Sequence, residues 1–153
     1  MRVRFGEGFL ALAVIGLLAL PVYAADTEIK VEQAWARASI GTSRPAAAFV
    51  TITNTSKHAM MLTSLTSSVA GMVEVHKTVK DGTVIKMVPA GPIEIPAGGR
   101  LEMAPGGYHI MLIALTRAVK KGEILDLTLH FSDGTETKAT ATVMGPGALE
   151  PTQ

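Results

Sequence analysis

Short runs rich in Val, Ile, Thr and Leu recur from Ile29 onward, separated by Gly, Pro, Asn and Asp at intervals of about eight to twelve residues. This rhythm is typical of all-β sandwiches and barrels, because each run suffices for one strand and each interruption for one turn. We therefore expect a single all-β domain, folded as an antiparallel β-sandwich. The expected strands are residues 29–38, 47–54, 60–65, 71–79, 83–88, 100–103, 108–115, 123–131 and 135–143.

Two segments outside these runs complete the expected outline. Residues 116–121 fit one helical turn, and no longer amphipathic helix is apparent. Residues 145–153 follow the last apolar run, and chain ends without such runs are seldom packed. We therefore expect the folded domain to span residues 25–144 and a disordered tail to follow it.

The N-terminus has the three-part layout of a secretory signal peptide. Arg2 and Arg4 precede an apolar stretch over residues 9–20, and Ala24 supplies a small residue at a cleavage position. The apolar stretch is too short for a stable membrane span, which leaves an uncleaved anchor as the weaker alternative. We expect residues 1–24 to be removed, the mature protein to work in a periplasm, and no stable membrane insertion.

The composition excludes several classes of function. The 14 basic and 13 acidic residues leave a formal charge of +1, without the basic patch that nucleic-acid binding requires. With no Cys, the chain lacks disulfides, thiolate zinc sites, blue-copper centres, cysteine catalysis and a lipid-modified cysteine. No supported Ser-His-Asp arrangement, phosphate-binding loop or pair of carboxylates is apparent, so we expect no enzyme.

A predicted hairpin brings one histidine and one methionine together. If Asp81-Gly82 forms a two-residue loop, the residues on either side pair so that His76 lies directly opposite Met87. Directly opposed side chains share a face of the sheet, with Cβ atoms about 5 Å apart. That separation suits two side chains that share one metal ion.

A second such pair lies on one later strand. His109 and Met111 are two residues apart, so a strand points both to one face, which we expect to be the core-facing side shared with Ile113 and Leu115. Two His–Met pairs could then converge into a four-ligand site. Thioether sulfur is soft and both ligand types are neutral, a combination that favours Cu(I) over Zn²⁺, Mg²⁺ and Ca²⁺.

The remaining candidates have plainer interpretations. Met103 lies near the Pro105 turn and could support the site from a second layer, while Glu74 could orient the His76 ring or simply be solvated. The residues expected to be ordinary surface or core side chains are His58, His130, Met60, Met61 and Met72.

The spacing H-x10-M-x21-H-x-M, formed by His76, Met87, His109 and Met111, resembles the copper-binding motif of the periplasmic copper chaperones called PCuAC. Other stretches similar to that family are Trp35-Ala36-Arg37-Ala38, Pro45-Ala46-Ala47-Ala48, Ile95-Pro96-Ala97-Gly98-Gly99 and Pro105-Gly106-Gly107-Tyr108-His109. The resemblance implies a cupredoxin-like β-sandwich, with these four residues as ligands of one Cu(I) per chain. The sequence departs from the family at Lys77, where many members carry Met. It also departs in its C-terminal tail, which lacks the His and Met residues that form a second copper site in some members.

The resemblance also implies a partner. It points to a copper-accepting protein, either subunit II of cytochrome c oxidase with its dinuclear copper site or an intermediate copper carrier. We expect the chaperone to be a monomer and to release copper by ligand exchange. The alternative is a structural or adhesive periplasmic β-sandwich with no metal role, in which the four residues would be incidental.

Overall fold

The computed structural model describes residues 28–151, so the predicted signal peptide lies outside the described residues. Within residues 28–151 the structure is built of strands and turns, and it contains no helix that could cross a membrane. The strands are β1 (Ile29–Arg37), β2 (Ala46–Asn54), β3 (Met60–Thr66), β4 (Ala70–Asp81), β5 (Val84–Pro89), β6 (Ile93–Ile95), β7 (Arg100–Glu102), β8 (Tyr108–Leu115), β9 (Ile124–Phe131) and β10 (Glu136–Met144).

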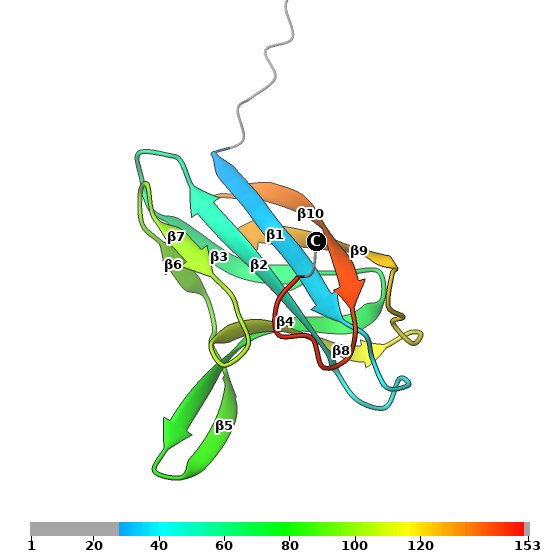
Figure 1. The fold of residues 1–153 in the computed structure, drawn as a ribbon. Coiled ribbons are helices and arrows are strands. Elements are labelled where there is room, and N and C mark those ends of the chain that lie inside the picture. Colours follow the sequence, from blue (N-terminus) through cyan, green and yellow to red (C-terminus); the bar gives the residue numbers. More distant parts are fainter. Residues whose placement is uncertain (1–27, 152–153) are drawn as a thin grey trace, which may run out of the picture.

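The strands form one continuous mixed sheet in the order β5-β4-β8-β2-β1-β10-β9-β3-β6, with β7 paired to β2. The sheet folds over on itself, so that its two halves form facing layers, while β5 at one end projects away from them (Figure 1). The expected all-β sandwich is thereby confirmed. It is not wholly antiparallel, because β1 and β10 run parallel, with Trp35 opposite Thr142 and Arg37 opposite Met144.

The core lies between the two layers and follows the alternation of the strands. On β9, Leu125, Leu127 and Leu129 are at most 1% exposed, whereas Asp126 points outward. Trp35 stacks on Phe49 with ring centroids 4.4 Å apart, which fastens β1 to β2.

On β8 the prediction of the core-facing side was wrong. Ile110 and Leu112 are fully buried in the core, so His109 and Met111 point to the opposite face of the strand. Leu115 reaches the core because Ala114 has a φ of 53°, and this left-handed residue interrupts the alternation.

The predicted helical turn at residues 116–121 was also wrong. The backbone there bonds to other segments: Thr116 N–H donates to the Val69 carbonyl, and Val119 N–H donates to the Ser39 hydroxyl. Val119 is 1% exposed, so this loop is tied down by its buried side chain instead of by helical hydrogen bonds. β6 was not predicted, because its three residues lie between Pro92 and Pro96.

The segment after β10 lies against the body of the protein. The Arg37 Nε donates to the Ala148 carbonyl at 2.7 Å, and Ala148 is partly buried against the core. Residues 145–151, expected to be part of a disordered tail, are therefore held in place over the end of β1. The last two residues of the expected tail lie outside the described residues.

Candidate metal centre

The β4–β5 hairpin projects from the body of the sheet and differs in register from the prediction (Figure 1). Its loop is Gly82-Thr83, so that His76 lies opposite Pro89 and Met87 lies opposite Thr78. Gly82 has a φ of 61°, which suits the first loop position of a type II′ turn; the predicted loop would have required a positive φ at Asp81.

This correction leaves the two candidate ligands on one face. Because the pairing moves by two positions, His76 and Met87 become diagonal neighbours instead of direct partners. Diagonal side chains on paired strands are about 7–8 Å apart at their Cα atoms, within reach of a long methionine side chain.

The other pairing of β4 brings the two histidines face to face. His76 lies directly opposite His109 of β8, and their ring centroids are 6.1 Å apart with the ring planes inclined by 20°. Glu74 lies opposite Met111 in the same register. Three neighbouring strands therefore carry the predicted ligand set on a single face of the sheet.

His76 and His109 each have one ring nitrogen near a polar partner. The His109 Nδ1 lies 3.1 Å from the Gly107 carbonyl, and this hydrogen bond assigns the ring proton to Nδ1. The His76 Nε2 lies 3.7 Å from a Glu74 carboxylate oxygen. The His109 Nε2 and the His76 Nδ1 are buried and have no hydrogen-bond partner within residues 28–151.

Unpartnered buried nitrogens of this kind are unfavourable by about 1–3 kcal/mol each. An ion that accepted both lone pairs would remove that penalty. In metal sites the second ring nitrogen of a histidine ligand commonly donates to a carbonyl or carboxylate, as Gly107 and Glu74 permit here. The two rings therefore fit a metal ion.

A pocket of about 90 Å³ opens beside the His109 ring. It is lined by Arg37, Ala47, Phe49, Thr78, Met87, Pro105, Gly106, His109 and Met111. His76 does not line this pocket and reaches the site through its contact with His109. His109 is 4% exposed, whereas Met87 is 62% exposed, so the candidate centre is buried on one side and open on the other.

Sequence reasoning missed the wall of this pocket. The Arg37 guanidinium lies 5.5 Å from the centroid of the Phe49 ring, and Phe49 in turn stacks on Trp35. The stretch Trp35-Ala36-Arg37-Ala38 was noticed in the sequence, but the sequence did not indicate that its Arg37 lines the pocket of the candidate ligands.

The other His and Met residues lie elsewhere. Met103 is 3% exposed and packs in the core, outside the pocket, so the support suggested for it is not observed. His58 lies 3.7 Å from Glu28, and the His130 Nδ1 lies 3.0 Å from Glu136. Within residues 28–151, no three His, Asp or Glu side chains gather as a metal site would require, so a site here depends on the thioethers.

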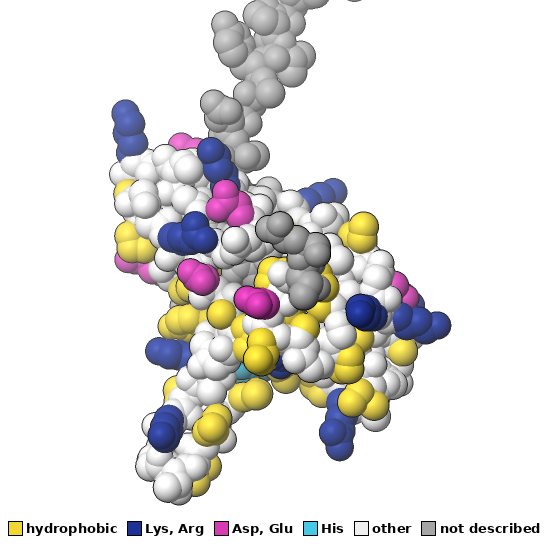
Figure 2. All heavy atoms as spheres, viewed as in Figure 1, with side chains coloured by type: hydrophobic (Ala, Val, Ile, Leu, Met, Phe, Trp, Pro, Cys, Tyr) yellow, Lys and Arg dark blue, Asp and Glu magenta, His cyan; other side chains and the backbone are white. Residues whose placement is uncertain are grey.

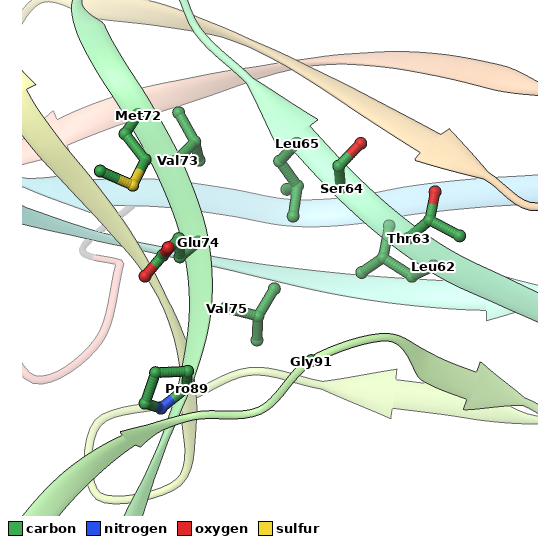
Figure 3. Close-up of a pocket in the computed structure, with 10 residues that line it drawn as sticks. All are labelled: Leu62, Thr63, Ser64, Leu65, Met72, Val73, Glu74, Val75, Pro89 and Gly91. Atoms are coloured by element: carbon green, nitrogen blue, oxygen red, sulfur yellow. The ribbon is translucent and has the colours of Figure 1, made fainter.

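A larger hollow of about 300 Å³ lies between β3 and β4 (Figure 3). Leu65 and Val75 point toward the space between the two strands, and the Glu74 carboxylate is the charged group of its lining. One carboxylate among apolar and hydroxyl side chains provides no pair of groups for acid–base or nucleophilic catalysis. The contact that the structure gives the Glu74 carboxylate is with His76.

Comparison with known proteins gives a family. The family described as "Putative lipoprotein LpqE-like" matches residues 29–143, which is most of the chain. The chain belongs to the LpqE-like family. "Putative lipoprotein Lxx21020" of Leifsonia xyli subsp. xyli is 35% identical over 116 residues, which cover 75% of this chain and 69% of the relative. "Uncharacterized protein RP573" of Rickettsia prowazekii is 30% identical over 73% of this chain and 64% of its own length.

Several solved structures similar to this LpqE-like chain are PCuAC domains or the DR1885 protein, and two of them contain copper. The apo PCuAC domain of PmoF2 has a TM-score of 0.66 and 25% identity, and the comparison covers 81% of this chain and 95% of that domain. The copper-bound PCuAC domain of PmoF2 has a TM-score of 0.65. The solution structure of CuI-DR1885 from Deinococcus radiodurans is 32% identical, with a TM-score of 0.56, over 79% of this chain and 83% of that one.

Proposed function

We propose that the protein is a periplasmic copper chaperone that binds one Cu(I) per chain through His76, Met87, His109 and Met111. The observation that carries the proposal is the pair of buried imidazole nitrogens that lack partners within residues 28–151, next to two thioethers on the same face. The copper-bound PCuAC domain and CuI-DR1885 support it, because they share the fold.

The donor set explains the choice of ion. Two imidazoles and two thioethers are neutral, so they suit a singly charged, soft cation, whereas Zn²⁺, Mg²⁺ and Ca²⁺ prefer thiolate, imidazole or oxygen ligands. The absence of Cys also excludes a blue-copper electron carrier. We therefore assign a carrier role without catalysis.

Release would proceed from the open side. Met87 lies on an edge strand and is mostly exposed, so a ligand of an acceptor can approach the copper as the Met87 thioether leaves. The acceptor proposed is subunit II of cytochrome c oxidase, with its dinuclear copper site, or an intermediate carrier. The family and one relative are described as lipoproteins, which supports export. These 153 residues contain no Cys to which a lipid could be attached. We therefore propose export by the N-terminal signal peptide.

The test is an anaerobic titration of residues 25–153 with Cu(I) against a colorimetric chelator. One equivalent of tightly bound Cu(I) is expected, and it should be lost in the variant carrying Met87→Ala and Met111→Ala. The matched control is Met72→Ala, because Met72 is an exposed methionine of β4 that does not line the pocket. An unmodified protein that fails to compete with the chelator would leave a structural sandwich as the better account.

A further inference from the structure

Strand β5 is an exposed sheet edge with an unusual number of apolar side chains. It is the terminal strand of the sheet, and every one of its residues is exposed. Val84, Ile85, Met87 and Val88 are 52%, 68%, 62% and 37% exposed. Exposed apolar edge strands promote association, so a protein that keeps one commonly uses it to bind a partner.

Only one face of this hairpin adjoins the candidate centre. Lys80 lies opposite Ile85, and Thr78 lies opposite Met87, so these four side chains share the face that continues into the pocket. Figure 2 shows histidine at the base of the hairpin, between hydrophobic side chains. We call the set of Ile85, Met87, Lys80 and Arg37 the docking face.

The charges around the docking face are predominantly positive. Arg37 lines the pocket of the candidate centre. Arg37 and Arg44 together line a second pocket. Within residues 28–151, neither arginine nor Lys80 forms an ion pair with a carboxylate, whereas Lys86 on the other face of the hairpin is paired with Asp81 at 3.1 Å. Glu74 is the acidic residue beside the histidines, and it is directed at His76. A bound Cu(I) would add a further positive charge.

We propose that the docking face receives an acidic surface that surrounds an open metal-ligand site on the acceptor protein. This rests on the proposed function. Carboxylates of the acceptor pair with Lys80 and Arg37, while Ile85 supplies apolar contact. Copper stays Cu(I) throughout: the bond to the Met87 sulfur breaks as a bond to an acceptor ligand forms, and no electron is transferred.

A second copy of the chain fits this face less well. Pairing two β5 edges would bring Lys80 and the arginines of one copy toward those of the other, and like charges that meet at an interface oppose association. An acidic partner instead gains from the same charges, because complementary fields accelerate association.

The experiment measures copper transfer from the loaded protein to two synthetic peptides. Both contain the same Cys-x-x-Cys copper-binding sequence, and one is flanked by Glu, the other by Lys. The Glu-flanked peptide is expected to accept copper about tenfold faster at low salt, and the difference should shrink as salt shortens the Debye length. Lys80→Glu should slow transfer to the Glu-flanked peptide about 3- to 10-fold and speed transfer to the other.

The control is Lys57→Glu, which makes the same charge change in the loop between β2 and β3. This loop follows the C-terminal end of β2, whereas Met111 pairs with Ala47 near the start of β2. Equal transfer rates to the two peptides, with Cu(I) binding intact, would overturn the docking proposal alone. Failure of the unmodified protein to bind Cu(I) would overturn the proposed function and this proposal with it. A stable dimer in sedimentation that the Ile85→Glu change dissociates would assign the face to a second copy and overturn the acidic partner.

Discussion

His76 and His109 lie directly opposite each other on β4 and β8, and each ring keeps one buried nitrogen without a hydrogen-bond partner within residues 28–151. Their ring centroids are 6.1 Å apart. This pairing holds two imidazoles in position before any ion arrives. Preorganisation of this kind favours binding because little side-chain entropy remains to be lost.

The histidine pair should be required for copper binding. His109→Ala is expected to weaken Cu(I) affinity about tenfold or more, equivalent to about 1.4 kcal/mol, because it removes a proposed ligand. Chelator competition gives the affinity. His130→Ala is the control, since His130 lies on β9 and bonds to Glu136. Equal losses in the two variants would contradict the assignment of His109.

The unpartnered nitrogen of His76 predicts a conflict between stability and binding. His76→Leu should leave the copper-free protein as stable as the original or more so, since an apolar side chain removes a penalty of about 1–3 kcal/mol. The same variant should gain less stability from added Cu(I). Urea unfolding with and without Cu(I) measures both effects. A variant that is destabilised without copper would show that the Nδ1 of His76 is satisfied in solution.

Glu74 should act on copper through His76. Its carboxylate lies 3.7 Å from the His76 Nε2, on the side of the ring away from the free nitrogen. Glu74→Gln is expected to weaken Cu(I) affinity about tenfold. Loss of a group that orients a metal ligand typically weakens affinity by about 10- to 100-fold, and the lower value is expected here because the carboxylate is partly exposed. Glu94→Gln on β6 serves as the matched control. An unchanged affinity in Glu74→Gln would reduce Glu74 to a solvated side chain.

Asp126 gives a pH dependence of stability that is independent of copper. The Ser68 hydroxyl donates to its carboxylate, and this bond, together with the Ser68 N–H, lowers the pKa of Asp126 below the ordinary value of 3.8. Because the folded-state pKa is depressed, the stabilisation is complete above the unfolded pKa and is lost as pH falls through the folded pKa.

Ser68→Ala should therefore be less stable than the original protein at neutral pH by about 0.5 kcal/mol, a low figure because Asp126 is exposed. The difference should diminish once the pH falls below the folded pKa. Urea unfolding at neutral pH and at pH values below 3.8 measures it. A difference that persisted in acid would place the effect in the Ser68 loop instead of the carboxylate.

Much of this fold could be predicted because strand rhythm is a local property of the chain. The β8 bounds matched the prediction, and the other expected strands differ from the observed ones by at most a few residues. The register of the β4–β5 hairpin could not be settled, since Asp81-Gly82 and Gly82-Thr83 both offer acceptable two-residue turns. The choice depends on which residue takes the positive φ, and that residue is Gly82.

The candidate site could be predicted only in part. Spacing along strands places His109 and Met111 on one face, but it does not say which face is buried. Here the long apolar run of β8 offers both choices, and Ile110 and Leu112 fill the core. The pocket wall of Arg37 and Phe49 depends on contacts between β1, β2 and β8, which no local pattern encodes.

The parallel pairing of β1 with β10 has a consequence for how the chain acquires its structure. The first strand cannot complete its hydrogen bonding until the last strand has arrived, so the closing step joins residues separated by almost the whole domain. Such long-range closure slows folding. If the protein is exported as proposed, its sheet can close only after the C-terminal strand has emerged on the far side of the membrane.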